Sequence, residues 1–589
     1  MSNHSDHLST LIQNARDWID FESSIEDLEE HHTELKQLIA DAESTGDHHR
    51  LSERFEGRLH FGTAGLRGEI GSGPQRMNLA LIRWVSVGLS RYLGGLIGSH
   101  SRRIVIGYDG RHRSLDFARE AADCLCDAGF DVELSTGICP TPLLAYAVCH
   151  RNAIAGIMVT ASHNPPKDNG FKVYWGNGAQ IIPPQDLEIS TAIDQVDWRT
   201  LSQRRVVDLA HIGRLSPLDL SPRGELGKSY REELSGYLAS RRQTTLPLPL
   251  KVVYTAMHGV GAQWTEVLLG EHPELDLIPV LEQRDPDPDF PTVSFPNPEE
   301  PGALDLAKSY AERHNAPLIL AHDPDADRLA VVARTAEGEL KAFTGDQIGA
   351  LIAHEMFSLR ELSSHDLVAT TIVSSSLLRE MAKRVGVQYA ETLTGFKWIA
   401  NRALSHKADG GRFLFGYEEA IGYSLFGLVN DKDGLSAGLF LAEMALRAQQ
   451  EGLTLWDRLS EIYRLDGLYL SSLISRVRRG SEGAREIAES MQYLRTTPPT
   501  EIAGTQVIEV TDFLESPQPL TGDVLRFRLA DGSRVIARPS GTEPKLKLYF
   551  EVRIEVSTAD LSERRDYGEV RLQSLSKAFE GLLDSAQSS

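Results

Sequence analysis

Arg103-Ile104-Val105-Ile106-Gly107-Tyr108 is a short apolar run, and residues 114–128, which follow it, have the pattern of a helix. A second apolar run, residues 153–159, comes next. A strand, a helix and another strand in this order form a β-α-β unit, in which helices cover a mostly parallel sheet. This stretch therefore predicts an α/β domain that ends near residue 215.

The same rhythm returns twice further along the chain. Residues 251–255 and 317–321 have the pattern of strands in a second α/β segment. Residues 368–373 and 412–415 have that pattern in a third. Each run is short, apolar and followed by a helical pattern, which is typical of a buried strand in a covered sheet. We therefore expect three successive α/β segments.

The last part of the chain has a different pattern. Apolar runs at residues 524–529 and 534–537 flank Asp531-Gly532, which is a hairpin turn signal. Residues 546–552 form another strand-like run, and an amphipathic helix ends the chain. The predicted fold class is therefore three α/β domains with mixed or parallel sheets, followed by one α+β domain.

Length agrees with this division, because 589 residues at about 150 per domain correspond to about four domains. The first segment begins with a polar, helical extension, and residues 215–224, which contain Pro and Asp, are predicted to be a linker. The predicted domains are residues 1–215, 216–335, 336–470 and 471–589.

Composition excludes several classes of function. A net charge of -22 argues against binding to nucleic acids or anionic membranes, which require a basic field. A phosphate ligand must therefore be held by local Arg, Lys and backbone N–H groups. The chain has no signal-peptide pattern and no run of about 18 apolar residues. Its four cysteines are expected to be buried thiols, and we expect a cytoplasmic monomer or weak homodimer.

The first stretch that suggests chemistry is Thr160-Ala161-Ser162-His163-Asn164-Pro165-Pro166, directly after a predicted strand. Ligands of open α/β sheets bind outside the carboxyl ends of the strands. Ser162 is expected to be exposed on a turn, beside His163, which could assist proton transfer. The stretch is not a G-x-S-x-G elbow, and a plain Ser/Asn/Pro turn is the alternative.

The second stretch is Asp323-Pro324-Asp325-Ala326-Asp327-Arg328, again just after a strand. In an extended chain, residues two apart face the same side, so three carboxylates would converge and repel one another without a cation. Oxygen ligands suit Mg²⁺ or Ca²⁺, and phosphate oxygens usually complete a Mg²⁺ site. An EF-hand fails, because Arg328 and Arg334 stand where its Gly and Glu are required. A solvated acidic turn is the alternative.

The third stretch, residues 538–547 (RPSGTEPKLK), offers a guanidinium, hydroxyls, ammoniums and backbone N–H groups near a glycine. These groups suit a phosphate monoester, whereas no Walker A spacing occurs in the chain. Residues 62–68 (GTAGLRG) could wrap an anion in the same way. Residues 394–398 (TGFKW) and 416–420 (GYEEA) could recognise sugar hydroxyls. Ordinary polar turns and a packed aromatic core are the alternatives.

From about residue 58 to its end, the chain resembles the α-D-phosphohexomutase superfamily, and within it the phosphoglucomutase/phosphopentomutase-like branch. The stretches TASHNPP, DPDADR, GYEEA and RPSGTEPK occur in the family's order. The resemblance implies four domains around a central cleft. It also implies an isomerase that moves a phosphate within one sugar, with one Mg²⁺ per chain and a sugar 1,6-bisphosphate as intermediate and activator.

The resemblance also implies roles for single residues. Ser162 is the phosphoserine, and it binds Mg²⁺ together with Asp323, Asp325 and Asp327. The residues expected to surround the reacting phosphoryl group are Arg67, His163, Lys172 and Arg328. Those expected to bind the sugar and its distal phosphate are Thr63, Gly395, Lys397, Glu418, Glu419, Arg538, Ser540, Gly541, Thr542 and Lys547.

Two departures leave the sugar and the general base open. Many hexose-specific relatives have Gly-Glu-x-Ser, and here Ala420 stands in place of that Ser. Some relatives have a His after this motif, and here Ile421, Gly422 and Tyr423 follow. We expect a phosphoglucomutase that acts on glucose 1-phosphate and glucose 6-phosphate. The alternatives are a phosphopentomutase, a phosphomannomutase, a glucose-1,6-bisphosphate synthase, a plain phosphatase and a non-catalytic phosphosugar sensor.

Overall fold

The computed structural model divides into two compact units. Unit 1 comprises Met1–Val331 and Tyr423–Ala442, and unit 2 comprises Val332–Gly422 and Glu443–Ser589. The structure describes residues 2–25, 29–60, 65–99, 101–203, 213–238, 249–358, 361–478, 480–540, 545–556 and 560–587.

The first sheet of unit 1 is mixed and has the strand order β1-β5-β4-β2-β3-β6. Strand β2 pairs in parallel with β3 and β4, whereas β5 is antiparallel to β4 and β1. The predicted strands and helix at residues 103–159 are confirmed as β2, α5 and β4. The elements are β1 (Leu66–Glu69), α4 (Leu79–Gly94), β2 (Arg103–Tyr108), α5 (Ser114–Asp127), β3 (Asp131–Ser135), α6 (Thr141–His150), β4 (Ala155–Val159), β5 (Asp168–Trp175), α7 (Gln185–Asp194) and β6 (Leu215–Leu218).

The linker predicted at residues 215–224 is wrong at its start. Residues 215–218 form strand β6, which pairs in parallel with β3, so the predicted boundary at 215 falls inside a strand. Leu218 is buried. Pro217 fits there because an edge strand tolerates a residue that cannot donate a ladder hydrogen bond. The Pro and Asp content that suggested a linker is thus compatible with a sheet edge.

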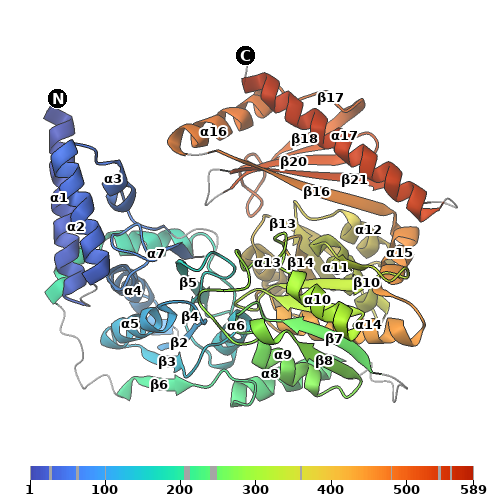
Figure 1. Ribbon diagram of the computed structural model, residues 1–589, viewed down its shortest axis with the longest axis horizontal. Helices are drawn as coiled ribbons and strands as arrows, with labels where there is room; N and C mark the ends of the chain where they lie inside the picture. The colour runs from blue at the N-terminus through green and yellow to red at the C-terminus, as the bar shows by residue number, and fades with distance from the viewer. Residues whose placement is uncertain are drawn as a thin grey trace. The chain divides into compact units, whose positions relative to one another are not determined.

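The N-terminal extension is helical, as predicted. It contains α1 (Ser2–Ser23), α2 (Glu29–Thr45) and α3 (His49–Phe55), and α1 and α2 lie side by side (Figure 1). The Trp18 ring makes edge contacts with Phe21 and Trp198, and Trp84 of α4 lies in the same cluster. The extension therefore shares an aromatic core with the first sheet's helices.

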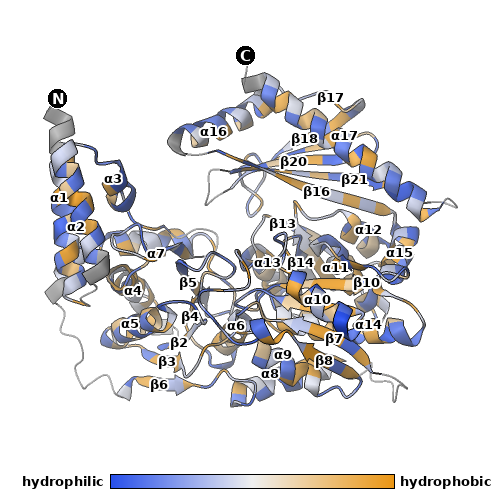
Figure 2. Ribbon diagram, in the orientation of Figure 1, coloured by the Kyte–Doolittle hydropathy of each residue, from blue (hydrophilic) through white to orange (hydrophobic). Residues whose placement is uncertain are grey.

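The second sheet has the parallel core β8-β7-β9, with β10 next to β9. The strands predicted at 251–255 and 317–321 are confirmed as β7 and β9. Strand β10 is drawn mostly in orange in Figure 2, as a buried strand requires. The elements are α8 (Glu225–Leu238), β7 (Leu250–Thr255), α9 (Ala262–Gly270), β8 (Leu275–Pro279), α10 (Asp305–His314), β9 (Leu318–His322), β10 (Leu329–Arg334) and β11 (Leu340–Ala342).

In unit 2, strands β13 and β14 pair in parallel with β12, and these confirm the predicted strands at 368–373 and 412–415. Strand β15 follows β14 along the chain and leads into unit 1. The elements of this part of the chain are α11 (Gly345–Ser358), β12 (Asp366–Thr371), α12 (Leu377–Val385), β13 (Gln388–Thr392), α13 (Phe396–Ala408), β14 (Arg412–Glu418), β15 (Gly422–Leu425), α14 (Gly434–Gln450) and α15 (Leu455–Asp466).

The last sheet is antiparallel, with the order β16-β21-β20-β19-β18-β17. Helices α16 and α17 lie on the same side of this sheet (Figure 1), as the predicted α+β class requires. Ile372 and Val373, beyond β12, pack against Ile536 and Tyr549 of this sheet. The elements are β16 (Leu468–Val477), α16 (Gly480–Thr496), β17 (Glu501–Ile502), β18 (Thr505–Asp512), β19 (Leu525–Leu529), β20 (Arg534–Pro539), β21 (Lys545–Ile554) and α17 (Leu561–Gln587).

Two further predictions can be compared with the structure. None of the four cysteines, all of which the structure describes, forms a disulfide. Cys124, Cys126 and Cys139 are buried as expected, but Cys149 is exposed, because it lies at the end of helix α6. Within the described part of the chain, no helix has the length and apolar content needed to cross a membrane.

Candidate active site

Ser162 lies in the loop after strand β4, in a left-handed backbone conformation with φ of 54°. Its N–H donates to Thr160 Oγ1 at 2.8 Å, and its hydroxyl donates to Asp323 Oδ2 at 2.8 Å. His163 Nδ1 lies 3.2 Å from the Ser162 oxygen. The expectation that Ser162 is exposed is wrong: its residue is only 2% exposed, because the aspartate turn covers it. The hydroxyl therefore faces a polar interior.

The three aspartates are brought together by a tight turn between β9 and β10. Ala326 has φ of 56°, and its N–H donates to the Asp323 carbonyl at 2.9 Å. The expectation of an extended chain is therefore wrong, but the expected convergence of the three carboxylates is confirmed. One oxygen from each of Asp323, Asp325 and Asp327 lies within 4.8 Å of the others, and all three residues are buried.

This arrangement fits a hard divalent cation. Asp325 Oδ1 and Asp327 Oδ1 are buried and accept no hydrogen bond from any residue that the structure describes. Buried carboxylate oxygens without a partner are costly unless a cation binds them. The pKa of Asp323 lies well above its usual value, mainly because the group is buried and also because Asp325 and Asp327 repel its charge. An oxygen-only set of this kind suits Mg²⁺.

Two lysines already offset part of the negative charge. Lys172 Nζ, on β5, lies 2.8 Å from Asp325 Oδ2 and 3.2 Å from Asp327 Oδ2. Burial disfavours the charge on Lys172, but these carboxylates raise its pKa above its usual value. Lys432 Nζ lies 3.1 Å from Asp327 Oδ2. The two ammoniums therefore offset part of the negative charge on Asp325 and Asp327.

Lys432 is a site residue that our sequence analysis missed. Its neighbour Asp431 accepts hydrogen bonds from the Tyr174 hydroxyl at 2.7 Å and from Gln180 at 2.9 Å, and these hold the loop against β5. Gly434 lets the next helix approach the aspartate turn, because a Cβ there would lie 2.9 Å from the Ala326 carbonyl oxygen. A signal did exist, since Lys432 stands between two aspartates in Asn430-Asp431-Lys432-Asp433.

The other residues predicted to act on the phosphoryl group lie in the same unit. Arg67, on β1, donates to Asn164 Oδ1 at 2.9 Å. The Arg328 N–H donates to Asp323 Oδ1 at 3.0 Å, and its guanidinium lies 3.9 Å from Asp327 Oδ1. Burial and the positive charges of Arg328 and Arg67 hold the pKa of His163 well below its usual value. His163 is therefore neutral at pH 7.

Unit 2 contains the residues predicted to bind the sugar. Glu418 accepts a hydrogen bond from the Gly395 N–H at 2.7 Å, and Gly395 has φ of 115°, which favours glycine. Glu419 accepts from Thr371 at 3.2 Å and from Ser374 at 3.1 Å. Burial is the main cause, and the charges of Glu418 and Asp346 add to it, in raising the pKa of Glu419 to about 7. Our sequence analysis missed Thr371 and Ser374.

Lys397 is buried at the start of helix α13, with its ammonium 5.8 Å from the Trp398 ring centroid. Lys397 lies two residues after Gly395, whose N–H donates to Glu418. The 394–398 stretch and the 416–420 stretch therefore meet, as a shared sugar site requires.

The structure describes only part of the predicted phosphate cradle at residues 538–547. Arg538 and Lys547 face each other in register on β20 and β21, and the Ser540 N–H donates to the Lys545 carbonyl at 2.7 Å. Gly541 and Thr542, like Thr63, lie outside the described residues. Burial and the nearby carboxylates of Glu419 and Glu418 raise the pKa of Tyr549 in β21, which also contacts Arg538. The residues predicted to form the cradle thus lie close to those predicted to bind the sugar.

A buried ion pair joins these two parts of unit 2. Arg534 Nε donates to Glu551 Oε1 at 2.8 Å, and both side chains are almost fully buried. Arg534 also binds the carbonyls of Ile372 and Ser374, and Glu551 accepts from the Ser376 N–H at 2.9 Å. Ser374 is therefore held from the last sheet through its carbonyl while its hydroxyl binds Glu419.

Comparisons with known proteins agree with this geometry. The chain is 36% identical to human (Homo sapiens) phosphopentomutase over 578 residues, which cover 92% of this chain and 91% of that protein. It is 35% identical to the phosphoglucomutase of Staphylococcus aureus over 513 residues, covering 85% and 91%. A solved phosphoglucomutase/phosphomannomutase family protein from Burkholderia thailandensis shares the fold, with a TM-score of 0.65, 22% identity and coverage of 90% and 97%.

The family models match along most of the chain, and the chain belongs to the phosphoglucomutase/phosphomannomutase family of the α-D-phosphohexomutase superfamily. It is a phosphosugar mutase, an enzyme of the isomerase class, with the four-domain architecture of that family. The matches are to alpha/beta/alpha domain I at residues 58–200, domain II at 228–338, domain III at 344–464 and the C-terminal domain at 485–566.

Proposed function

We propose that this chain is a phosphoglucomutase, which interconverts α-D-glucose 1-phosphate and glucose 6-phosphate through phosphorylated Ser162. The observation that carries the proposal is the position of the Ser162 hydroxyl, 2.8 Å from Asp323 Oδ2 in the buried aspartate cluster. A hydroxyl there can accept and return a phosphoryl group beside a cation and two lysines. Phosphoryl transfer depends mainly on such positioning and charge neutralisation.

In the first half of the reaction, the bond between phosphorus and Ser162 Oγ breaks, and a bond from phosphorus to a sugar hydroxyl oxygen forms. The hydroxyl proton leaves the sugar, and Ser162 regains a proton at Oγ. Lys172, Arg67 and Arg328 would offset the charge on the transferring oxygens. The product is glucose 1,6-bisphosphate, which must turn so that its other phosphate faces Ser162 and reverses the same bond changes.

Asp323, Asp325 and Asp327 would hold Mg²⁺ together with an oxygen of the phosphoserine. Bound there, Mg²⁺ supplies Lewis acidity at the transferring phosphoryl group. The support is the pair of buried carboxylate oxygens, Asp325 Oδ1 and Asp327 Oδ1, that accept no hydrogen bond from the described residues and that a hard cation would satisfy.

The distal phosphate would bind Arg538 and Lys547, together with Ser540, Gly541 and Thr542. This cradle gives a reason for transfer within one sugar, since a phosphatase needs no second phosphate site. The sugar hydroxyls would contact Glu418, Glu419 and Lys397. Because Ser162 and all three aspartates are present and assembled, a sensor that has lost catalysis is disfavoured.

A phosphopentomutase is the second candidate, and one observation favours it. Ala420 offers no hydroxyl beside Glu419, and the Glu419 carboxylate is already engaged by Thr371 and Ser374. A site with fewer hydroxyl contacts suits a smaller sugar. Human phosphopentomutase, named above, is a relative of this chain. A small phosphosugar substrate, a cytoplasmic location and a monomer or weak homodimer complete the proposal.

Coupled assays with glucose 1-phosphate, mannose 1-phosphate and ribose 1-phosphate test the substrate. We expect the highest kcat/KM with glucose 1-phosphate and turnover only when a trace of the bisphosphate is present. A higher kcat/KM with ribose 1-phosphate would assign the pentose activity instead. Net accumulation of glucose 1,6-bisphosphate from a separate phosphate donor would indicate a bisphosphate synthase.

A further inference from the structure

Arg111 follows strand β2, at the same edge of the sheet as the Ser162 loop, because β2 and β4 are adjacent and parallel. Its guanidinium donates four hydrogen bonds to that loop. The Nη2 group donates to the carbonyls of Ser162 at 2.7 Å and Asn164 at 2.5 Å. The Nη1 group donates to the carbonyls of Pro165 at 2.8 Å and Asp168 at 3.1 Å.

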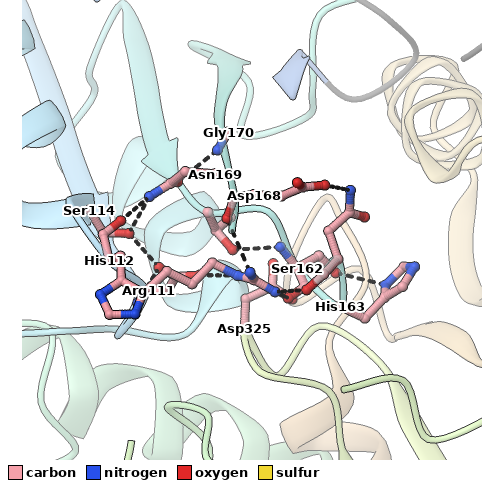
Figure 3. A network of polar contacts seen from close by, with 12 residues as sticks. Arg111, His112, Ser114, Ser162, His163, Asp168, Asn169, Gly170 and Asp325 are labelled. Atoms are coloured by element: carbon pink, nitrogen blue, oxygen red, sulfur yellow. Dashed lines mark hydrogen bonds and ion pairs between the residues drawn. The ribbon is translucent and has the colours of Figure 1, made fainter. Parts of the chain in front are cut away.

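Figure 3 shows the Arg111 side chain reaching into this loop, with Ser162 and His163 on it. Carbonyl dipoles that converge on one point repel one another unless a donor with several N–H groups binds them. A guanidinium presents such groups in a rigid fork, whereas a lysine ammonium does not. Arg111 is therefore suited to fix the loop as one body.

The loop needs such a restraint, because Ser162 has φ of 54°. Residues other than glycine occupy this left-handed region only when surrounding contacts hold them there. One of these contacts comes from Thr160, which binds the Ser162 N–H. The contact on the carbonyl side of Ser162 comes from Arg111, so the two together fix both peptide groups around the nucleophile.

Arg111 is itself anchored on both sides. Its Nε lies 3.5 Å from Asp109 Oδ2, and Asp109 accepts from Ser114 Oγ at 2.6 Å. The Phe290 ring, from the loop after β8, covers the guanidinium with its centroid 5.0 Å from Cζ. Arg111 is only 5% exposed and Phe290 only 2%, so water does not compete for the carbonyls.

We propose that Arg111 is the positioning residue of the nucleophile: it holds the Ser162 loop in the strained conformation that aims Oγ at the phosphoryl site. This inference rests on the proposed role of Ser162 as the phosphoserine. Arg111 acts through the loop backbone, since its guanidinium is taken up by carbonyl oxygens and the Asp109 carboxylate.

The test uses the full chain, freed of phosphate and supplied with Mg²⁺, as wild type, Arg111→Lys and Arg58→Lys. Arg58 is the matched control, because it is also buried and donates to backbone carbonyls, at Leu59 and Ser190. Glucose 1,6-bisphosphate is added, and the rate of Ser162 phosphorylation is followed by quenched reaction and intact mass.

We expect Arg111→Lys to phosphorylate Ser162 about 100-fold more slowly than wild type, since a misplacement of about 1 Å costs about this factor. The KM for glucose 1-phosphate should stay unchanged while kcat falls, and Arg58→Lys should react as wild type does. A rate for Arg111→Lys equal to that of wild type or Arg58→Lys would overturn the inference. A wild type that is never phosphorylated would instead overturn the proposed function.

Should Arg111→Lys fail to fold, Phe290→Leu keeps all four carbonyl contacts and removes only the covering ring. We then expect faster amide hydrogen exchange at residues 161–169 and slower phosphorylation of Ser162, with strand β7 as the internal reference for exchange. Wild-type exchange and wild-type phosphorylation in Phe290→Leu would contradict the inference.

Discussion

Lys432 Nζ lies 3.1 Å from Asp327 Oδ2, so an ammonium from a loop more than 100 residues later in the sequence contacts the aspartate turn. Lys432 and Asp327 are both buried. In this position the ammonium can offset charge on the aspartates and on a phosphoryl group that reacts beside them. Removal of the ammonium should change both Mg²⁺ binding and phosphoryl transfer, and each effect can be measured separately.

Replacing this ammonium in Lys432→Met leaves one more uncompensated negative charge at the aspartates. We expect Mg²⁺ to bind at least about tenfold more tightly, because the ammonium repels Mg²⁺ and charges at such distances interact by several kcal/mol at an effective dielectric constant of about 20. Phosphoryl transfer should slow at the same time, since the transferring oxygens lose a cation. Calorimetric titration with Mg²⁺ and the coupled assay measure the two effects.

Lys167→Met is the matched control, because Lys167 pairs with Glu69 at an exposed position of the same unit. It should leave both the Mg²⁺ affinity and the rate unchanged. If Lys432→Met behaves like this control, the ammonium has no electrostatic role at the site.

Mg²⁺ should stabilise the protein itself. The three aspartates repel one another in the absence of a cation. A ligand that binds only the folded chain adds about 2.7 kcal/mol to the free energy of unfolding at 100 times the ligand's Kd. We expect the thermal midpoint to rise with Mg²⁺ and to fall again with EDTA. Asp325→Asn should abolish the shift, whereas Asp289→Asn, at an exposed position of unit 1, should keep it. An unchanged midpoint in the wild type would argue against a metal site at the aspartates.

The raised pKa of Glu419 predicts how the free energy of unfolding changes with pH. Its pKa in the folded chain is about 7, against an ordinary value of 4.5. Between these values the folded chain holds a proton that the unfolded chain has lost, so the free energy of unfolding falls as pH rises. The stabilisation is full below about pH 4.5 and lost above pH 7, with a total of about 3 kcal/mol.

The measurement is the difference in free energy of unfolding between wild type and Glu419→Gln, from denaturant titrations at pH 5 and pH 7.5. Taking the difference cancels the other titrating groups. The wild type should lose stability relative to Glu419→Gln on going to the higher pH. A difference that is constant with pH would show that Glu419 ionises normally.

The buried Arg534–Glu551 pair allows a stability test in unit 2. Arg534→Met leaves Glu551 buried without its cation, which costs about 3–5 kcal/mol. Because Arg534 also binds the Ser374 carbonyl, KM for the phosphosugar should rise as well. Arg528→Met, which removes an exposed pair with Glu509 in the neighbouring strand, should cost under about 1 kcal/mol. Equal losses in the two variants, by denaturant titration, would show that burial of the first pair is unimportant.

Much of the fold and site could be predicted from the sequence because the signals are local. The apolar run at residues 103–108 and the three aspartates are readable within a few residues, and the structure confirms the strand and the convergence of the three carboxylates. The carboxyl ends of strands also indicated where ligands bind. This rule could have identified Arg111, which lies in the loop just after strand β2.

The remaining features depend on contacts between distant parts of the chain. Lys432 reaches the aspartates only because Asp431 binds Tyr174, and no local pattern encodes that pairing. The burial of Ser162 depends on the aspartate turn, and β6 depends on the free edge of β3. Such contacts are decided by packing, which overrides the local preference of Pro217 for a loop.

The most direct test of the central claim is the mass of residue 162 after reaction. Wild type and Ser162→Ala are each incubated with Mg²⁺ and glucose 1,6-bisphosphate, mapped by peptide mass spectrometry, and assayed with glucose 1-phosphate. We predict one added phosphoryl group on the wild-type peptide that contains Ser162, and neither modification nor mutase activity in Ser162→Ala. An unmodified Ser162 together with a fully active Ser162→Ala would contradict the account.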